Sequence, residues 1–186
     1  MIKWLKKILG IKDMKPMIDD ATCIQRLALN EGLRNKAYYC PAGKLTIGIG
    51  RNLDDNPLTA EEIAVVGHNA RGKAITNEQA MYLCRNNIAS VRADLDRELP
   101  WWRDLNPDRQ FVMLDLCFNM GIGSEKKKTG LLSFKNTLPL IAQGNYEQAA
   151  TNLLKSKYAK DVGIRAERNA YALRTGTWVA NPPKGV

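Results

Sequence analysis

Glu31 is the residue whose type and position best suit acid catalysis. It lies seven residues after Ile24 on the apolar stripe of a predicted helix, in the last turn of that helix. Burial and the negative end of the helix dipole both disfavour a carboxylate, so we predict that Glu31 donates a proton near neutral pH. The alternative is a structural ion pair with a basic residue, namely Arg34, Arg165 or Arg168.

The run 45–50 suits the binding of a flat ligand and a water molecule. Its apolar residues alternate with Thr46, Gly48 and Gly50, which predicts a strand with one apolar and one nearly bare face. Glycines let a ring approach the backbone, and the Thr46 hydroxyl can hold a water. With a proton donor nearby, this strand would suit hydrolysis of a glycosidic bond, which needs an acid and a positioned nucleophile. An equally weighted alternative is that the two glycines are needed only for tight packing of the sheet and not for ligand binding.

A helix followed by a small sheet must position these residues. The apolar spacing predicts a helix over 20–31, and Gly32 ends it. Residues 33–53 predict a β-hairpin, because a Pro-Ala-Gly turn at 41–43 precedes the alternating run. The sequence therefore places Glu31 at the junction between a helix and a small sheet.

After Pro57 the pattern is helical almost to the end of the chain. A capping box at Thr76 begins a helix over 77–99, which is long enough to join two lobes. The fold class is therefore α+β, with a small β-hairpin lobe at about 32–75 and a larger helical lobe at about 100–178. Further helices are predicted over 108–120, 134–143, 145–157 and 162–173.

The first 18 residues predict a basic amphipathic leader, followed by a single domain over 19–180 and a tail at 181–186. We predict that residues 1–15 contact an anionic membrane, with a packed leader as the alternative. The sequence shows no clear cleavage site and no long apolar run, so neither a signal peptide nor a membrane span is predicted. Four apolar residues of the leader fall on one helical face: Ile2, Leu5, Ile8 and Leu9.

The chain carries a formal net charge of +9, with Lys and Arg spread along its whole length. This predicts an anionic partner, and a membrane, a nucleic acid or a bacterial cell wall would each qualify. No zinc-finger or RNA-binding signature supports a nucleic acid, so we predict no specific nucleic-acid binding. The three lysines at 126–128 are interpreted as a solvated loop.

Four cysteines and one histidine limit the available metal chemistry. The cysteine spacings match no zinc pattern, and His68 alone is too little for a His-based triad or a His-rich metal site. We therefore predict no metal and no cofactor. Three cysteines lie in predicted helices and are expected to be buried free thiols, namely Cys23, Cys84 and Cys117.

Three spaced residues carry a resemblance to a known family. Glu31 is followed by eight residues, Cys40, five residues and Thr46. This resembles the pattern of Glu, then Asp or Cys, then Thr in the phage-type lysozymes, glycoside hydrolase family 24. The resemblance covers about residues 20–178. It continues in the family's order through the runs 43–50, 118–121, 133–138, 165–168 and 174–178.

The resemblance implies a lysozyme-like two-lobe fold with the substrate in the cleft between the lobes. It implies that Glu31 is the general acid and that Thr46 helps to place the attacking water. Asn119 is expected to line the cleft, and Arg165 is expected to pack near the catalytic glutamate.

Cys40 stands where an aspartate is common in the family. A thiol is mostly neutral at pH 7 unless its pKa is lowered, and three roles are open: a base that activates water, a covalent nucleophile, or a spacer. A base predicts inversion at the anomeric carbon, whereas a nucleophile predicts retention; we favour the base. Asp54 and Asp55 are alternative carboxylates, although a solvated turn is the preferred interpretation.

The resemblance further implies an endolysin with muramidase activity. Such an enzyme hydrolyses the β-1,4 bond between N-acetylmuramic acid and N-acetylglucosamine in bacterial peptidoglycan, and so lyses the host. It is expected to be a monomer and to stay in the host cytoplasm until released to the wall. Two alternatives are a lytic transglycosylase, which closes an anhydro ring without water, and a cationic membrane-active protein that lyses without catalysis.

Overall fold

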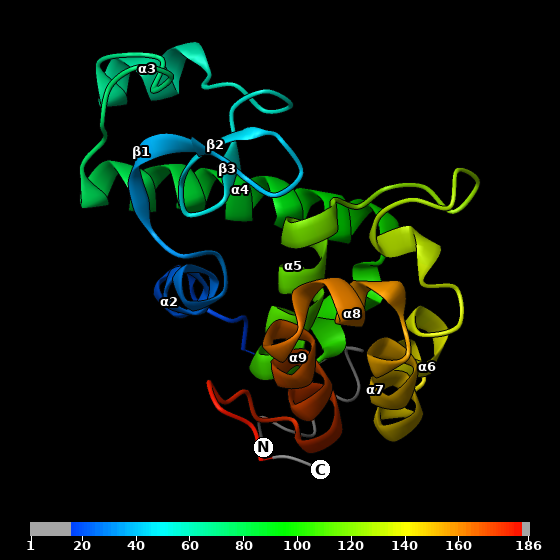
Figure 1. Ribbon diagram of the computed structural model, residues 1–186. Coiled ribbons are helices and arrows are strands. Elements are labelled where there is room, and N and C mark those ends of the chain that lie inside the picture. The colour runs from blue at the N-terminus through cyan, green and yellow to red at the C-terminus, as the bar shows by residue number, and fades with distance from the viewer. Residues whose placement is uncertain (1–15, 184–186) are drawn as a thin grey trace, which may run out of the picture.

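A computed structural model of the protein describes residues 16–183. Helices dominate this part of the chain, and one antiparallel sheet of strand order β1-β2-β3 lies to one side (Figure 1). The predicted α+β class is confirmed. The elements are α2 (Asp20–Glu31), β1 (Arg34–Tyr39), β2 (Leu45–Gly48), β3 (Arg51–Asn52), α3 (Ala60–Val66), α4 (Asn77–Glu98), η1 (Pro100–Asp104), α5 (Pro107–Met120), η2 (Leu131–Ser133), α6 (Leu138–Ala142), α7 (Tyr146–Leu154), α8 (Lys157–Val162) and α9 (Ile164–Thr175).

Helix α2 has Glu31 as its last residue, as predicted. Asp19 caps the helix by accepting a hydrogen bond from the Thr22 N–H at 2.8 Å. Gly32, with a φ of 76°, ends it. The helix buries one face through residues at helical spacing, namely Cys23, Ile24 and Leu27.

The middle strand of the sheet is shorter than predicted. Strand β2 ends at Gly48, because Gly48 and Gly50 have φ values of 64° and 68°, which are open to glycine at little cost. The backbone turns there and returns as β3. The alternation of faces predicted for 45–50 is therefore wrong beyond Gly48, since it requires an extended backbone.

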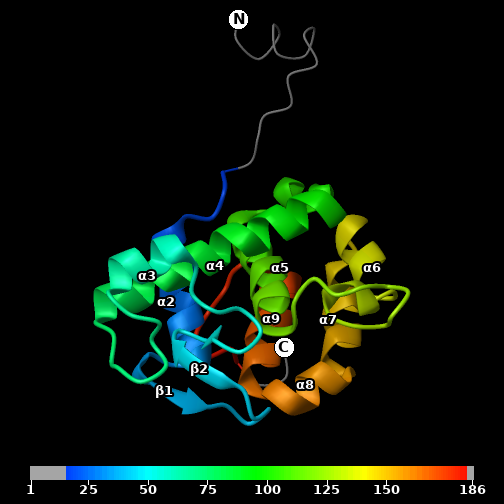
Figure 2. The same ribbon diagram turned by 90° about the horizontal axis from the view of Figure 1, so that it is seen from above.

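Helix α4 joins two hydrophobic cores. Ala80 and Leu83 belong to the core under the sheet and α3, whereas Cys84 and Ile88 belong to the larger core of the helical lobe. Figures 1 and 2 show α4 running along the sheet and α3 and on toward α5. The helix ends at Glu98, one residue earlier than predicted, and a proline follows at residue 100. The predicted helix between the two lobes is confirmed.

Helix α5 lies in the middle of the helical lobe, where it contacts both α4 and α9. Its residues from 110 to 117 are all buried, so this stretch has no solvent-facing side. One of these buried residues is acidic, Asp115. A carboxylate in such a place needs partners, which other helices must supply.

The C-terminal helices differ from the prediction in their bounds. The Ser156 hydroxyl caps a separate helix by accepting the Ala159 N–H at 3.2 Å. Gly163, with a φ of 55°, then separates that helix from the last one. Helix formation is decided by such caps as much as by apolar spacing. The corrected elements are α6 in place of 134–143, α7 in place of 145–157, the additional helix α8, and α9 in place of 162–173.

Ile18 belongs to the core, although the predicted leader includes it. Its side chain is 4% exposed, its N–H donates to Gln110 Oε1 at 2.9 Å, and its carbonyl accepts from Arg92 Nη2 at 2.8 Å. The predicted membrane contact at 1–15 lies outside the described residues, as does the end of the tail at 184–186. Within the described part, no helix is long and apolar enough to cross a membrane.

Candidate active site

The Glu31 carboxyl lies against Gly50 and Phe118. A Cβ atom on Gly50 would be 3.2 Å from both Cγ and Cδ of Glu31, and equally far from Cε1 of Phe118. The Glu31 side chain is 20% exposed, so it is largely removed from water yet reachable from it. The end of α2, the turn after β2 and the end of α5 therefore meet around one accessible carboxyl.

Arg165 of α9 holds this carboxyl in place. Its Nη1 donates to Oε1 of Glu31, while Nε and Nη2 donate to the two carboxylate oxygens of Asp115 at 3.0 and 2.8 Å. The Arg165 side chain is 6% exposed and that of Asp115 is fully buried. One guanidinium is thus shared by two carboxylates. The more buried of them, Asp115, accepts two of its hydrogen bonds, and Glu31 accepts one.

Asp115 is the centre of a buried polar network that was not predicted. Asn30 Nδ2 and Asn169 Nδ2 donate to its carboxylate at 2.9 and 2.7 Å. Arg168 Nη1 in turn donates to Asn30 Oδ1 at 2.7 Å. A signal was available, because Asp115 is the single charged residue in the otherwise apolar run 111–118. A carboxylate in such a run is expected to be buried and partnered.

Arg165, Asp115 and Glu31 are the ionisable groups that decide the charge in this part of the site, because two other titratable groups nearby are neutral near pH 7. Burial raises the pKa of the Cys84 thiol to about 12, and it also raises the pKa of the Tyr158 hydroxyl, so both stay neutral. Burial disfavours the Arg165 cation, but Asp115 and then Glu31 outweigh this effect and raise the pKa of Arg165. The charge in direct contact with the two carboxylates is therefore that of Arg165, and Arg168 lies one hydrogen bond further away, at Asn30.

Cys40 and Thr46 meet across the hairpin turn. The Cys40 N–H donates to the Lys44 carbonyl at 2.9 Å, and the Thr46 hydroxyl donates to the same carbonyl at 3.1 Å. The Lys44 N–H lowers the pKa of the Cys40 thiol against the opposing effect of burial, with help from the Ala42 N–H and the Thr46 hydroxyl. The thiolate is therefore more accessible near neutral pH than in an ordinary cysteine.

Tyr38 connects these two parts of the site. Its pKa is raised, mainly by burial, and the charges of Glu31 and Cys40 both add to that increase. The guanidinium of Arg34 lies over its ring, 4.1 Å from the centroid. The Tyr38 hydroxyl is therefore within electrostatic reach of both the carboxyl at the end of α2 and the thiol at the turn. Sequence reasoning did not single it out.

The three residues predicted to share a bare face are not arranged in that way. A Cβ on Gly48 would meet Ala80 Cβ at 3.4 Å and Ile75 Cδ1 at 3.6 Å, in the core of the small lobe. Thr46 is 5% exposed. Only Gly50 lies beside Glu31. Tight packing therefore explains Gly48, whereas close approach to the carboxyl explains Gly50.

Asp54 and Asp55 stabilise the hairpin, and within the described part of the chain their partners all belong to the small lobe. Asp54 accepts the Leu45 N–H at 2.8 Å, and Asp55 pairs with Lys44 at 2.9 Å. The interpretation of these two carboxylates as a solvated turn accounts for both contacts.

Asn119 is exposed on the wall of a groove of about 900 Å³ in the helical lobe. It directly follows Phe118, so the groove begins one residue from the ring beside Glu31. Phe134 and Tyr158 in its lining pack edge to face, with centroids 6.3 Å apart. The groove is cationic, because four lysines line it, namely Lys128, Lys135, Lys155 and Lys157.

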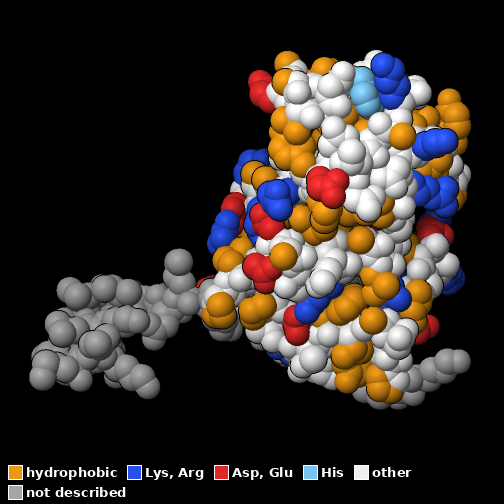
Figure 3. Space-filling view, turned by 90° about the vertical axis from the view of Figure 1, so that its left-hand side faces the viewer, with side chains coloured by type: hydrophobic (Ala, Val, Ile, Leu, Met, Phe, Trp, Pro, Cys, Tyr) orange, Lys and Arg blue, Asp and Glu red, His pale blue; other side chains and the backbone are white. Residues whose placement is uncertain are grey.

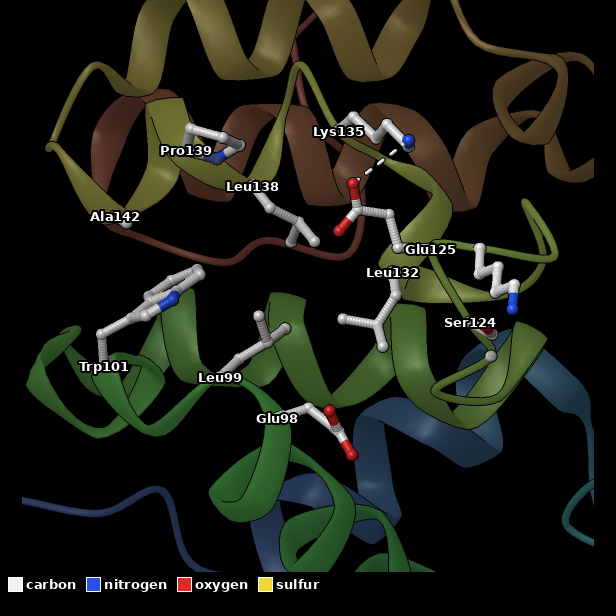
Figure 4. A pocket seen from close by; sticks show the side chains of 12 residues that line it. Glu98, Leu99, Trp101, Ser124, Glu125, Leu132, Lys135, Leu138, Pro139 and Ala142 are labelled. Atoms are coloured by element: carbon white, nitrogen blue, oxygen red, sulfur yellow. Dashed lines mark ion pairs between the residues drawn. The ribbon is translucent and has the colours of Figure 1, made fainter.

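A second groove, of about 680 Å³, shares only Lys135 with the first (Figure 4). Leu99, Trp101 and Leu132 point into it, and the ion pair of Lys135 with Glu125 at 3.1 Å lies at its rim. None of the predicted site residues lines it. Among the described residues, no group of His, Cys, Asp and Glu is arranged to hold a metal ion.

A matched pair of glycine variants separates backbone strain from crowding of the carboxyl. Gly50→Ala and Gly48→Ala each force alanine to a positive φ, which costs about 1–2 kcal/mol. Only the Gly50 variant pushes a methyl group against Glu31 and Phe118. We expect similar losses of stability in thermal unfolding, with a much larger loss of any activity that depends on Glu31 for Gly50→Ala. Equal losses of activity would show that the contact with Glu31 is unimportant.

A two-lobe α+β fold with a glutamate at the end of a helix, packed beside the turn that follows the middle strand of a small sheet, defines a lysozyme-like protein. The family model described as "Phage lysozyme" matches residues 28–171. The chain therefore belongs to the phage lysozyme family. All the residues discussed at the site lie inside the matched region.

Two relatives illustrate the range of this family. An endolysin of Acyrthosiphon pisum secondary endosymbiont phage 1 is 32% identical over 136 residues, which cover 73% of this chain and 77% of that protein. The pre-baseplate central spike protein Gp5 of Enterobacteria phage T4 is 29% identical over 175 residues, which cover 88% of this chain. The chain spans only 29% of the length of that spike protein.

Proposed function

We propose that the protein is an endolysin that hydrolyses the β-1,4 bond between N-acetylmuramic acid and N-acetylglucosamine in bacterial peptidoglycan. The observation that carries this proposal is the Glu31 carboxyl, which Arg165 holds against Gly50, with Tyr38 within electrostatic reach of both this carboxyl and the Cys40 thiol. Membership of the phage lysozyme family and similarity to an endolysin support it.

In the proposed reaction Glu31 gives its proton to the glycosidic oxygen as the bond from that oxygen to the anomeric carbon breaks. The oxygen of a water molecule bonds to the anomeric carbon, and its proton passes to a base, so the products are two free sugar ends. Once Glu31 is protonated, Arg165 and Asp115 remain as a neutral pair, so the acid form leaves no buried charge uncompensated.

Cys40 is proposed as the base that takes the proton from water. The lowered pKa of its thiol supports this role, as does the Thr46 hydroxyl beside it, which can turn from the Lys44 carbonyl toward a water. The product of such a reaction has inverted configuration at the anomeric carbon. A covalent role for the sulfur would instead give retention, and a spacer role would leave activity unchanged on removal of the thiol.

The products of purified peptidoglycan test this chemistry. Mass spectrometry is expected to show muropeptides with reducing ends, and proton NMR is expected to show inversion at the newly formed end. A Cys40→Ala variant should lose about 10²-fold in rate, whereas Cys40→Asp should keep most of it. Anhydro products would instead show that the protein catalyses the lytic transglycosylase reaction and not hydrolysis. Retained configuration would exclude Cys40 as a base for water.

The basic leader is proposed to bring the enzyme to anionic membranes. The helical spacing of its four apolar residues and the lysines between them support this proposal. Basic side chains are also interspersed with acidic ones on the face of the folded domain shown in Figure 3. Deleting residues 1–15 is expected to weaken sedimentation with anionic phospholipid vesicles and to leave peptidoglycan cleavage intact. Unchanged sedimentation would remove the membrane role. Lysis that persists without any glycan cleavage would favour a membrane-active protein.

The location of the protein in the host cell is proposed from its similarity to an endolysin. On this basis the protein is proposed to remain in the host cytoplasm until it is released. It is then proposed to act on the cell wall as a monomer. Specific nucleic-acid binding is not part of the proposal, because the sequence carries no zinc-finger or RNA-binding signature.

A further inference from the structure

We propose that Asp115 is a positioning residue that keeps Glu31 able to hold a proton, by engaging most of the Arg165 guanidinium. This inference rests on the proposed role of Glu31 as the acid. Asp115 touches no substrate, since it is fully buried in α5. It would act only through the arginine that it shares with Glu31.

The geometry of the guanidinium favours Asp115. Arg165 presents Nε and Nη2 to the two oxygens of Asp115 in a side-on pair, at 3.0 and 2.8 Å, and Nη2 also faces the Asp115 carbonyl at 3.4 Å. Only Nη1 is directed to Glu31. A bidentate pair of this kind is stronger and more directional than a single contact. Arg165 is therefore oriented by Asp115 and only assisted by Glu31.

The charges lead to the same conclusion. With both carboxylates ionised, two negative charges share one positive charge, so protonation of Glu31 removes an excess charge and leaves a neutral pair. Without the Asp115 charge, Arg165 would be neutralised by Glu31 alone. A protonated Glu31 would then leave a buried cation unpaired, which is costly. The acid form of Glu31 would be lost at lower pH as a result.

No other group around Glu31 takes over this effect. Tyr38 from β1, Cys84 from α4 and Tyr158 from α8 all have raised pKa values and are neutral across the working range. Two further cations lie nearby: Arg34 lies over the Tyr38 ring, and Arg168 donates to Asn30 rather than to either carboxylate. In the described residues around Glu31, the carboxylate of Asp115 is therefore the charge whose removal should matter.

The test is the pH dependence of the initial rate of peptidoglycan solubilisation in the intact chain. Asp115→Asn is expected to move the alkaline limb of the profile to lower pH by about one unit. Near neutral pH this corresponds to a rate about tenfold lower, while the rate on the acid side is largely kept. A merely structural role would lower the rate or the Tm without moving the limb.

Two further variants serve as control and rescue. Asn169→Ala removes one hydrogen bond to Asp115 and no charge, so it should lower the Tm and leave the limb in place. The double variant Asp115→Asn with Asn30→Asp returns a carboxylate to the cluster one hydrogen bond away, since these side chains are 2.9 Å apart. It should move the limb back toward that of the original protein.

The outcomes separate this inference from the proposed function. Suppose that the intact protein cleaves peptidoglycan in a Glu31-dependent way. If a folded Asp115→Asn variant then keeps the alkaline limb of its pH–rate profile in place, this inference is overturned and the proposed function stands. If Asp115→Asn does not fold, Asn30→Asp by itself should move the limb to higher pH, and no movement would overturn the inference. If the intact protein does not cleave glycan strands, the proposed function fails first.

Discussion

A Glu31→Gln variant is expected to keep its fold and to cleave peptidoglycan about 10³-fold more slowly than the original protein. Glutamine preserves the shape of the side chain and can still accept the hydrogen bond from Arg165 Nη1. It has no acidic proton for the glycosidic oxygen, so the leaving group must depart unprotonated. Turbidity loss of purified peptidoglycan and the yield of new reducing ends measure the effect.

Glu167→Gln is the matched control for this variant, because it makes the same change on an exposed position of α9. It should retain full activity. If the folded Glu31 variant solubilises peptidoglycan as fast as the control, Glu31 is not the acid. Lysis would then have to be explained by the leader and the net charge of the chain.

Replacing Arg165 by leucine is expected to lower the free energy of unfolding by about 3–5 kcal/mol, the range for breaking a buried ion pair on one side. Asp115 is fully buried and would lose its two shortest charged contacts. Asn30 and Asn169 would remain as its donors, but neither carries a charge. Urea unfolding followed by circular dichroism measures the change.

The double variant Arg165→Leu with Asp115→Leu tests the physical reason. Removing both charges leaves no buried ion uncompensated, so much of the lost stability should return even though the pair is gone. Lys157→Gln, which breaks the exposed pair with Asp161, should change stability little. A double variant no more stable than the single one would point to packing rather than charge as the cause.

Local pattern was sufficient for the elements that hold Glu31 and join the lobes. The helix of Asp20 to Glu31 is specified by its cap, its apolar spacing and the glycine that ends it, and all of these lie within a few residues. The long helix likewise begins at a capping box on Thr76. The burial of Cys23, Cys84 and Cys117 followed from their places on apolar helix faces, and all four cysteines are free.

Local pattern failed where a backbone turn changed the direction of the side chains. Thr46, Gly48 and Gly50 alternate in the sequence, yet only Gly50 reaches the carboxyl. An extended strand was assumed through residue 50, and the alternation ends with the positive φ at Gly48. Periodicity describes which residues share a face only while the backbone stays regular.

The composition of the charged cluster was decided by the tertiary structure alone. Residue types and spacing left Arg34, Arg165 and Arg168 open as partners of Glu31, and only the family resemblance singled out Arg165, which is 134 positions away and makes the contact. Asp115 had a recognisable local signal, but its partners come from α2 and α9, and no spacing predicts them. Amino-acid type and spacing specify which groups can ionise. Which charges face each other depends on how helices distant in the chain pack, because Coulomb interactions act through space.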